Sequence, residues 1–489
     1  MKDFNQYLEL TGEVGYVEES AHLVCYASGL PGAKVNEVVM FEGGEQGMVL
    51  SLGEFVEILP FAKDAVHVGT KVARTSAFLE IPVGEELLGH VISPLGQVLD
   101  GGNSVHPKEV RIIDTNPPGV LERTPVTTSL ETGVALVDLL VPLGRGQREL
   151  VIGDRKTGKT AFLFQTILTQ ARLGTVCIYA AVGKKHVEVA RAVELFKTRG
   201  IDKQVVTITA TSSDSAGLVF LAPFAAMTVA EYFRDKGKDV LVVLDDLTTH
   251  AKYYRAITLL ARRFPGRNSY PGDVFFVHAK LLERAGKFKE GSITALPVAE
   301  TILGDLAGYI QTNLMAMTDG HIFFDSELFT AGRRPAINPF LSVTRVGQQA
   351  QSGLVRSVSR ELSRFLVEIE KLREFMHFGA ELSEEVRTKL TLGDKVLTFF
   401  GFSSDTATMP ASMSVLITAM LWAGFWKEQD ITTIRTQIQQ LAQNYQEDAR
   451  FSGEVEKLLS ETKTFNELVD KVRDKTEWVS AGKNGTKTN

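Results

Sequence analysis

Residues 153–160 read GDRKTGKT and match the phosphate-binding pattern G-x-x-x-x-G-K-[ST]. An apolar run at residues 150–152 precedes them and predicts a buried strand, and residues 161–173 follow with a helix-like pattern. In a strand–loop–helix setting, backbone N–H groups and the helix dipole hold phosphate oxygens. The segment therefore predicts a nucleotide-binding site, around which the rest of the chain must be arranged.

Every residue of this loop is expected to contact the nucleotide. Lys159 is expected to reach the outer phosphates, and the Thr160 hydroxyl is expected to bind Mg²⁺. The remaining contacts are assigned to Gly153, Asp154, Arg155, Lys156, Thr157 and Gly158.

A second acid for the metal is predicted at Asp245, which directly follows an apolar run at residues 240–244. The alternative is that Asp245 caps the next helix, and the two roles are not exclusive. The strand predicted at residues 177–181 leads into Gly183 and Lys184 instead of a carboxylate that could orient an attacking water. A site with the loop and the metal acid alone is expected to bind ATP and turn it over very slowly.

Hydrophobic patterning divides the chain into several regions. After a short N-terminal segment (1–10), close and evenly spaced β-rich runs at 11–78 predict a β-barrel. Alternating strands and helices at 79–350 predict an α/β P-loop domain with a parallel sheet. Helical spacing at 351–479 predicts a helical bundle, and the polar tail 480–489 is expected to be disordered. The expected barrel strands are 15–18, 22–26, 37–41, 47–52, 55–59 and 66–68, and the expected later sheet strands include 176–181, 205–209, 240–244, 274–277 and 310–317.

Composition narrows the class of function. The net charge of −6 means that the chain has no overall positive charge to attract nucleic acid. The longest apolar run, residues 415–426, is too short to span a bilayer, and the first ten residues do not resemble a signal peptide. Cys25 and Cys177 both lie in apolar, strand-like runs and are interpreted as buried thiols. We therefore expect a cytoplasmic protein that reaches a membrane only through partners.

The phosphate-binding loop and the strand that ends in Asp245 occur together with further motifs in order along the chain. In this combination the chain resembles the alpha subunits of rotary F-type ATP synthases over nearly its whole length. The related beta subunits have a similar fold but carry a glycine–glutamate where this chain has Gly183 and Lys184, and they lack the arginine segment at 342–347. The resemblance rests on residues 82–89, 144–150, 153–160, 231–234, 245–247, 270–275, 281–284, 294–297, 334–338 and 342–347.

The resemblance implies a ring of three alpha and three beta subunits around a rotating gamma shaft, with catalysis at the beta sites. Arg345 would enter a neighbouring beta site, with Val343 beside it. The chain's own loop would hold ATP or ADP with Mg²⁺ and would not turn it over. Glu300 would lie near the water shell of that Mg²⁺. Arg334 and Phe402 are placed at the nucleotide on the same basis.

The resemblance also implies further contacts. The barrels would form a crown and the bundles would surround the shaft. The complex would meet the cytoplasmic face of a bacterial cell membrane only through its ion-conducting sector. Because only residues 1–10 precede the barrel, the contact with the delta subunit of the stator is expected to be reduced or replaced.

Three departures from the family pattern concern the nucleotide. Lys156 and Lys184 stand where the family usually has glutamine, and both add positive charge near the phosphates. Residues 399–404 lack the pair of glutamines that the family often uses near the adenine.

Two alternative functions compete with this interpretation. One is a subunit of a related hexameric ATPase with another mechanical task, such as secretion. The other is a ring helicase or RNA-translocating ATPase on a similar core. The acidic net charge and the missing carboxylate weigh against the helicase, and no nucleic-acid binding is expected.

Overall fold

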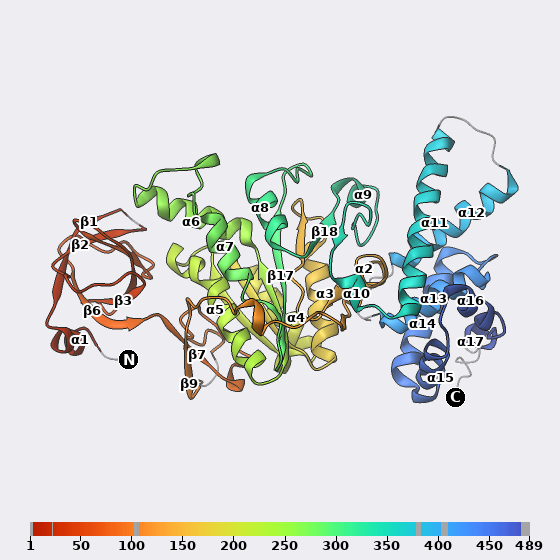
Figure 1. Cartoon of the computed structure of the whole chain (residues 1–489), viewed down its shortest axis with the longest axis horizontal. Helices are drawn as coiled ribbons and strands as arrows, with labels where there is room; N and C mark the ends of the chain where they lie inside the picture. Colours follow the sequence, from red (N-terminus) through yellow and green to blue (C-terminus); the bar gives the residue numbers. More distant parts are fainter. Residues whose placement is uncertain are drawn as a thin grey trace. The chain divides into compact units, whose positions relative to one another are not determined.

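The computed structural model describes residues 3–21, 23–101, 105, 107–377, 383–401 and 409–480 (Figure 1). The chain forms two compact units. The first unit comprises residues 1–125, 146–152 and 171–319, and the second comprises residues 126–145, 153–170 and 320–489.

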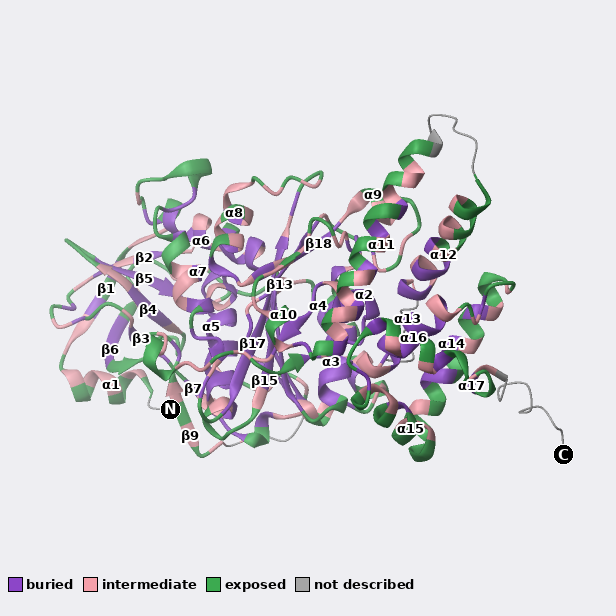
Figure 2. Cartoon of the chain, turned by 45° about the vertical axis from the view of Figure 1, so that its right-hand side comes forward, coloured by how far each residue is buried: buried purple, intermediate pink, exposed green. Residues whose placement is uncertain are grey.

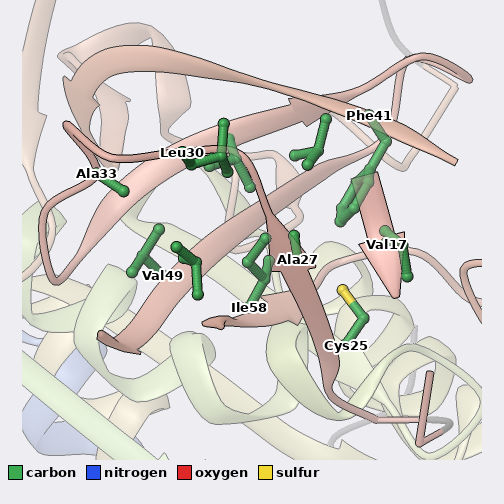
Figure 3. Close-up of a cluster of buried hydrophobic side chains, with 11 residues drawn as sticks. Val17, Cys25, Ala27, Leu30, Ala33, Phe41, Val49 and Ile58 are labelled. Atoms are coloured by element: carbon green, nitrogen blue, oxygen red, sulfur yellow. The ribbon is translucent and has the colours of Figure 1, made fainter. Parts of the chain in front are cut away.

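A closed β-barrel forms the N-terminal part of the first unit, as predicted (Figure 1). Alternating side chains fill its interior, among them Val17, Cys25, Phe41 and Ile58, all at most 1% exposed (Figure 3). Cys25 is a free, buried thiol, and burial raises its pKa to about 12. The barrel strands follow one another around the ring as β1 (Val14–Ser20), β2 (Cys25–Ser28), β5 (Val56–Pro60), β4 (Gln46–Leu52), β3 (Glu37–Phe41) and β6 (Lys71–Phe78).

The strand predicted at residues 66–68 is wrong. These residues lie in a loop and turn, and the last barrel strand is β6. Val66 packs against the barrel core from this loop, so its apolar character reflects burial and not a strand. Gly69, with φ +86°, closes the turn before β6 begins. His67 is exposed in this loop, contrary to its predicted place in a strand, and His22 lies outside the described residues.

A helix, α1 (Phe4–Thr11), precedes the barrel. The Asp3 side chain accepts a hydrogen bond from the Gln6 backbone N–H, and the Gln6 side chain accepts one in return from the Asp3 N–H. This capping box satisfies N–H groups that the first turn of a helix leaves without partners. Gly12, with φ +67°, ends the helix in the left-handed conformation typical of helix C-termini.

The remainder of the first unit is built on a parallel sheet with helices, which confirms the predicted α/β class. The strands pair in parallel through β17–β15, β15–β13, β13–β14 and β14–β8. Most of their residues are buried, which explains their nearly continuous apolar runs (Figure 2). In order across the sheet these strands are β12 (Leu150–Gly153), β17 (Ser292–Glu300), β15 (Asp239–Asp245), β13 (Val176–Lys184), β14 (Val205–Thr211) and β8 (Val91–Ile92).

Two predicted strands of this sheet are wrong. Residues 274–277 belong to helix α7 (Val274–Leu282), and residues 310–317 belong to helix α8 (Tyr309–Met317). In α7, Val274, His278 and Leu281 are buried while Phe275 and Phe276 are exposed, which is a helical period. A short apolar run does not distinguish a strand from a buried helix.

The other helices of this unit are α4 (His186–Thr198), α5 (Ala216–Asp235) and α6 (Leu247–Leu260). Of the described helices, α5 alone is long and apolar enough to cross a membrane. The apolar stretch of α5 is 83% buried inside the protein. This helix packs against β13, β14 and β15. Its apolar character is therefore accounted for by its place in the core.

A buried histidine pair links α6 to α7. His250 Nε2 donates to the Phe220 carbonyl oxygen (3.0 Å), so the neutral ring accepts at Nδ1 from His278 Nε2 (3.0 Å). Burial lowers the pKa of His250 to about 4 and lowers the pKa of His278 well below its usual value. Both rings are therefore neutral in the folded protein at pH 7.

Acid is expected to destabilise the protein through this pair. Unfolded histidines take up protons near pH 6.5, whereas folded His250 does so near pH 4. Between these values each buried histidine removes about 1.4 kcal/mol of unfolding free energy per pH unit as the pH falls. Urea unfolding at pH 7.5 and 5.5 measures this slope. His278→Gln should reduce it, whereas His67→Gln, an exposed control, should leave it unchanged; equal slopes would contradict the assignment.

The second unit contains short elements and then the predicted helical bundle. The short elements are β10 (Ser129–Leu130), α2 (Ala135–Leu140), β11 (Leu143–Gly144), α3 (Lys159–Arg172), β18 (Gly320–Phe324), α9 (Ser326–Thr330), β19 (Val343–Thr344) and α10 (Gly347–Ala350). The bundle consists of α11 (Gly353–His377), α12 (Glu384–Phe400), α13 (Ala411–Ala423), α14 (Ile431–Glu447), α15 (Ala449–Ser460), α16 (Phe465–Arg473) and α17 (Glu477–Ser480).

Helix α13 is the buried centre of this bundle: residues 413–421 are all buried (Figure 2). It packs against α16, α15, α12, α14 and α11. The apolar residues at 455–478 have helical spacing throughout, but this stretch is divided among α15, α16 and α17. The division arises because the Thr464 side chain accepts from the Glu467 N–H and starts α16. Residues 481–489 of the predicted tail lie outside the described residues.

Candidate nucleotide-binding site

The phosphate-binding loop connects β12 to α3, as the sequence predicts. A side chain at Gly153 would place its Cβ 2.3 Å from the Phe324 carbonyl oxygen, so only glycine fits there. Gly158, with φ +101°, turns the chain into α3, which begins at Lys159. Lys156 also has a positive φ, +63°, although it is not a glycine. The loop therefore has a tightly specified backbone that ends at a helix N-terminus.

The side chains of the loop hold this backbone in place. Lys159 is 8% exposed, and its Nζ donates to the carbonyl oxygens of Gly153 (2.7 Å) and Asp154 (2.6 Å). Thr157 Oγ1 also donates to the Asp154 carbonyl (2.7 Å). Thr160 is exposed in the first turn of α3, and Arg155 and Lys156 are exposed on the loop. The charged and hydroxyl groups of the loop that are predicted to bind phosphate or metal thus lie on one short segment.

Three carboxylates lie where strands of the first unit end. Asp245 ends β15 and Glu300 ends the neighbouring parallel strand β17. The third, Asp246, caps α6 by accepting from the Thr249 N–H, so the capping role considered for Asp245 belongs to its neighbour. Glu300 is half-buried, and its backbone N–H donates to Thr248 Oγ1 (3.0 Å). Strand β12 of the same sheet continues directly into the loop.

The Asp245 carboxylate is held by two partners. Lys184 Nζ lies 2.7 Å from Asp245 Oδ1 and 3.6 Å from Asp246 Oδ2. The Tyr179 hydroxyl donates to Asp245 Oδ2 (3.2 Å). Burial, with the charge of Asp245, raises the pKa of Tyr179 well above its usual value, so the hydroxyl stays protonated. Burial acts to lower the pKa of Lys184, but Asp245 and Asp246 outweigh it and raise that pKa.

Sequence reasoning missed Tyr179 and Asp246 as members of this cluster. Tyr179 pairs with Val243 in the β13–β15 register, and the ring reaches along the sheet to Asp245. That contact depends on which strands are neighbours, which no local pattern reveals. The role of Asp246 had a local signal, since an aspartate three residues before Thr249 at a helix start is a typical N-cap.

The end of β13 carries Lys184 where a water-orienting carboxylate would be needed. Glu188 lies in the first turn of α4, and its Oε2 accepts from the Lys185 N–H (3.0 Å). This carboxylate is therefore occupied in capping a helix.

Arg345 follows β19, which pairs with β18 in the second unit. Its side chain is exposed, and within the described ranges the guanidinium makes no hydrogen bond or ion pair. Val343, 41% exposed, lies two residues before it, close to exposed Phe340 and Leu341 (both 49%). A cation beside exposed apolar side chains is typical of a surface that meets a partner.

Arg334 lines a cavity of about 1040 Å³ in the second unit, together with Pro335, Phe340 and Phe400. Its guanidinium lies 3.5 Å from the centre of the Phe329 ring and donates to the Phe329 carbonyl oxygen (2.8 Å). Phe402, the other residue predicted at this end of the nucleotide, lies outside the described residues.

The residues present fit Mg²⁺ only in part. The described residues contain no cluster of three or more histidine, cysteine, aspartate or glutamate side chains that could hold a metal ion. Both oxygens of Asp245 already accept contacts from this chain, one of them from an ammonium group. Asp245 is therefore poorly suited to bind a metal directly while these contacts are kept.

A six-stranded barrel, an α/β domain with a phosphate-binding loop, and a helical bundle define a nucleotide-binding subunit of the P-loop ATPase class. The model of the ATP synthase alpha/beta family, nucleotide-binding domain, matches residues 133–344. ATP synthase subunit alpha of Neorickettsia sennetsu is 41% identical over 454 residues, which cover 89% of this chain and 88% of that protein. ATP synthase subunit alpha of Dictyoglomus turgidum is 44% identical over 389 residues, which cover 78% and 77%. The chain belongs to the family of ATP synthase alpha subunits.

Proposed function

We propose that this chain is the non-catalytic, regulatory alpha subunit of an F-type ATP synthase. Its own loop holds ATP or ADP without turning it over, and its Arg345 serves the catalytic site of a neighbouring beta subunit. The observation that carries the proposal is the end of β13, where Lys184 is ion-paired to Asp245 at 2.7 Å. An ammonium group cannot accept a proton from water or orient it as a carboxylate does.

Membership of this family supports a proposed assembly. Three such chains alternate with three beta subunits around the gamma shaft, and ATP synthesis or hydrolysis is coupled to transmembrane ion flow. The complex lies at the cytoplasmic face of the cell membrane and meets it through the ion-conducting sector. The delta subunit of the stator is a further proposed partner through α1, all of whose described residues are at least partly exposed.

The nucleotide is assigned to the loop residues 153–160, with Arg334 and Phe402 toward the base. Magnesium that accompanies the nucleotide is assigned to the Thr160 hydroxyl and to Asp245, with Glu300 near its water shell. Bound Mg²⁺ supplies positive charge to the phosphates. The chain's own contribution is the backbone of the loop, the Lys159 ammonium and the N-terminus of α3.

The non-catalytic role is tested by asking whether bound ATP is recovered from the chain without being hydrolysed. The purified chain is incubated with ATP and Mg²⁺, freed of unbound nucleotide, denatured, and its nucleotide separated by chromatography. Recovery as ATP over many minutes is expected, because the site lacks a group to orient water. Rapid appearance of ADP and phosphate from the chain alone would contradict the proposal.

Lys159→Ala is expected to weaken ATP binding by the isolated chain by about 10- to 100-fold, the effect of losing one hydrogen bond to a charged group. Calorimetry of the purified chain measures it. Lys203→Ala removes an exposed lysine that precedes β14 and should leave the affinity unchanged. If the affinity of Lys159→Ala equals that of the unaltered chain, the loop does not bind the nucleotide.

A further inference from the structure

One histidine of the second unit holds the segment that carries Arg345. His321 lies in β18 and is partly buried, and its Nε2 lies 2.8 Å from the Leu341 carbonyl oxygen. In the ladder between β18 and β19, His321 also pairs with Val343 through the backbone. The same residue therefore contacts the chain at two points, four and two residues before the arginine.

This contact fixes the state of the His321 ring. A carbonyl oxygen only accepts, so the proton lies on Nε2 and the ring donates to Leu341. Burial lowers the pKa of His321; the hydrogen bond to Leu341 acts to raise it, and the positive charge of Arg345 acts to lower it. The ring is therefore neutral at pH 7. The influence of Arg345 on this pKa also indicates that the imidazole and the guanidinium lie near each other.

The ladder that holds the segment is short. Strand β19 is two residues long and pairs with β18 through Gly320 with Thr344 and His321 with Val343. A two-stranded ladder of this length is marginally stable by itself. Leu341 is 49% exposed and Val343 is 41% exposed, so burial contributes little at these positions. A side-chain hydrogen bond from β18 is therefore a substantial part of what holds the segment.

Two further contacts anchor the segment beside the histidine. The Phe323 N–H donates to Ser342 Oγ at 2.9 Å, and Thr344 Oγ1 donates to the Pro142 carbonyl oxygen at 3.0 Å. Because these anchors do not involve the His321 side chain, the segment should stay folded when that side chain is replaced. What is lost is the exact placement of the backbone that leads to Arg345.

We propose that His321 is a positioning residue for Arg345: by holding the Leu341 carbonyl, it fixes the backbone from which the arginine reaches the neighbouring catalytic site. The inference rests on the proposed role of Arg345 in that site. It adds a residue that acts through the arginine and not on the nucleotide. A group that acts only in the transition state changes kcat and leaves KM nearly unaltered, and small displacements of such a group are costly.

Steady-state ATPase assays on the reconstituted complex of alpha, beta and gamma subunits test the inference with two side chains of different reach. His321→Gln keeps an amide N–H near the position of Nε2, whereas the shorter His321→Asn does not reach the Leu341 carbonyl. His321→Asn is expected to lower kcat about tenfold or more, with KM within about twofold of its original value. His321→Gln should recover most of this loss.

The control is His67→Asn, which makes the same change at an exposed histidine in the loop before β6 and should leave kcat unchanged. Urea unfolding of each variant checks that the chain is folded. If His321→Asn does not fold, His321→Phe keeps an aromatic ring and removes the donor. In an Arg345→Ala background, His321→Asn should lower kcat no further, because a positioning residue acts only through the arginine.

The outcomes separate the inference from the function on which it rests. If Arg345→Ala lowers turnover and His321→Asn does not, the inference is overturned and the role of Arg345 stands. A loss that His321→Gln does not recover, or that persists in the Arg345→Ala background, also overturns it. Near-normal turnover by Arg345→Ala contradicts the proposed role of the arginine itself.

Discussion

Arg345→Ala is expected to lower ATP turnover by the reconstituted complex of alpha, beta and gamma subunits about 10³-fold or more, with assembly intact. An arginine supplied in trans stabilises the charge that develops on the transferred phosphoryl group. In this chain Arg345 is exposed, and within the described residues its guanidinium has no hydrogen bond or ion pair. Its removal should therefore cost this chain little stability and should affect the neighbouring site.

Steady-state ATPase assays on reconstituted complexes measure the effect, and gel filtration checks the assembly. Arg345→Lys retains the charge but loses the planar group that contacts phosphate at two points, and it should recover only part of the activity. Arg364→Ala is the control, because Arg364 is an exposed arginine on α11 that pairs only locally with Glu361. Near-normal turnover by Arg345→Ala would show that the arginine does not act in catalysis.

Arg284→Met is expected to lower the unfolding free energy of the protein by about 3–5 kcal/mol. Arg284 is 1% exposed, and its guanidinium contacts Glu231 through two bonds, Nε to Oε1 (2.9 Å) and Nη2 to Oε2 (2.6 Å). It also donates to the Ile113 carbonyl oxygen (2.9 Å) and to Thr228 Oγ1 (2.8 Å). Removing the arginine takes away these bonds and leaves the buried Glu231 carboxylate only the longer contact with Arg234 (Nη1 to Oε1, 4.0 Å), which is the costly change.

Urea unfolding of the full chain measures this loss. Arg473→Met is the control, since Arg473 forms an exposed pair with Asp470, and exposed pairs contribute about 1 kcal/mol or less. The double variant Arg284→Met with Glu231→Gln removes both charges and should be less destabilised than Arg284→Met alone. A loss below about 1 kcal/mol for Arg284→Met would contradict the role of the pair.

The contacts of Arg284 also show that some motifs shared with the family have a structural role. Glu231 and Arg284 belong to two stretches, residues 231–234 and 281–284, on which the resemblance was based. They form a buried ion pair between α5 and the end of α7, so these stretches report the fold and not the chemistry of the site. The stretch 153–160, by contrast, forms the loop between β12 and α3 to which the nucleotide is assigned.

Local signals predicted most of the fold. The loop, the strand ending in Asp245 and the amphipathic helices each depend on residues that are near one another in sequence. The predictions for 274–277 and 310–317 were wrong because short apolar runs also occur in buried helices. The contact between Lys184 and Asp245 could not be predicted, because it requires β13 and β15 to be neighbours. A role of Arg345 in trans likewise depends on a second chain.

The most direct test of the account is the ATPase activity of the purified chain, measured alone and after mixing with the beta and gamma subunits. We expect no turnover by the chain alone and strong turnover in the mixture, because the proposed role of this chain is to supply an arginine to a beta site that has the catalytic carboxylate. Strong turnover by the chain alone would contradict it, since the end of β13 carries Lys184 and no group to orient water.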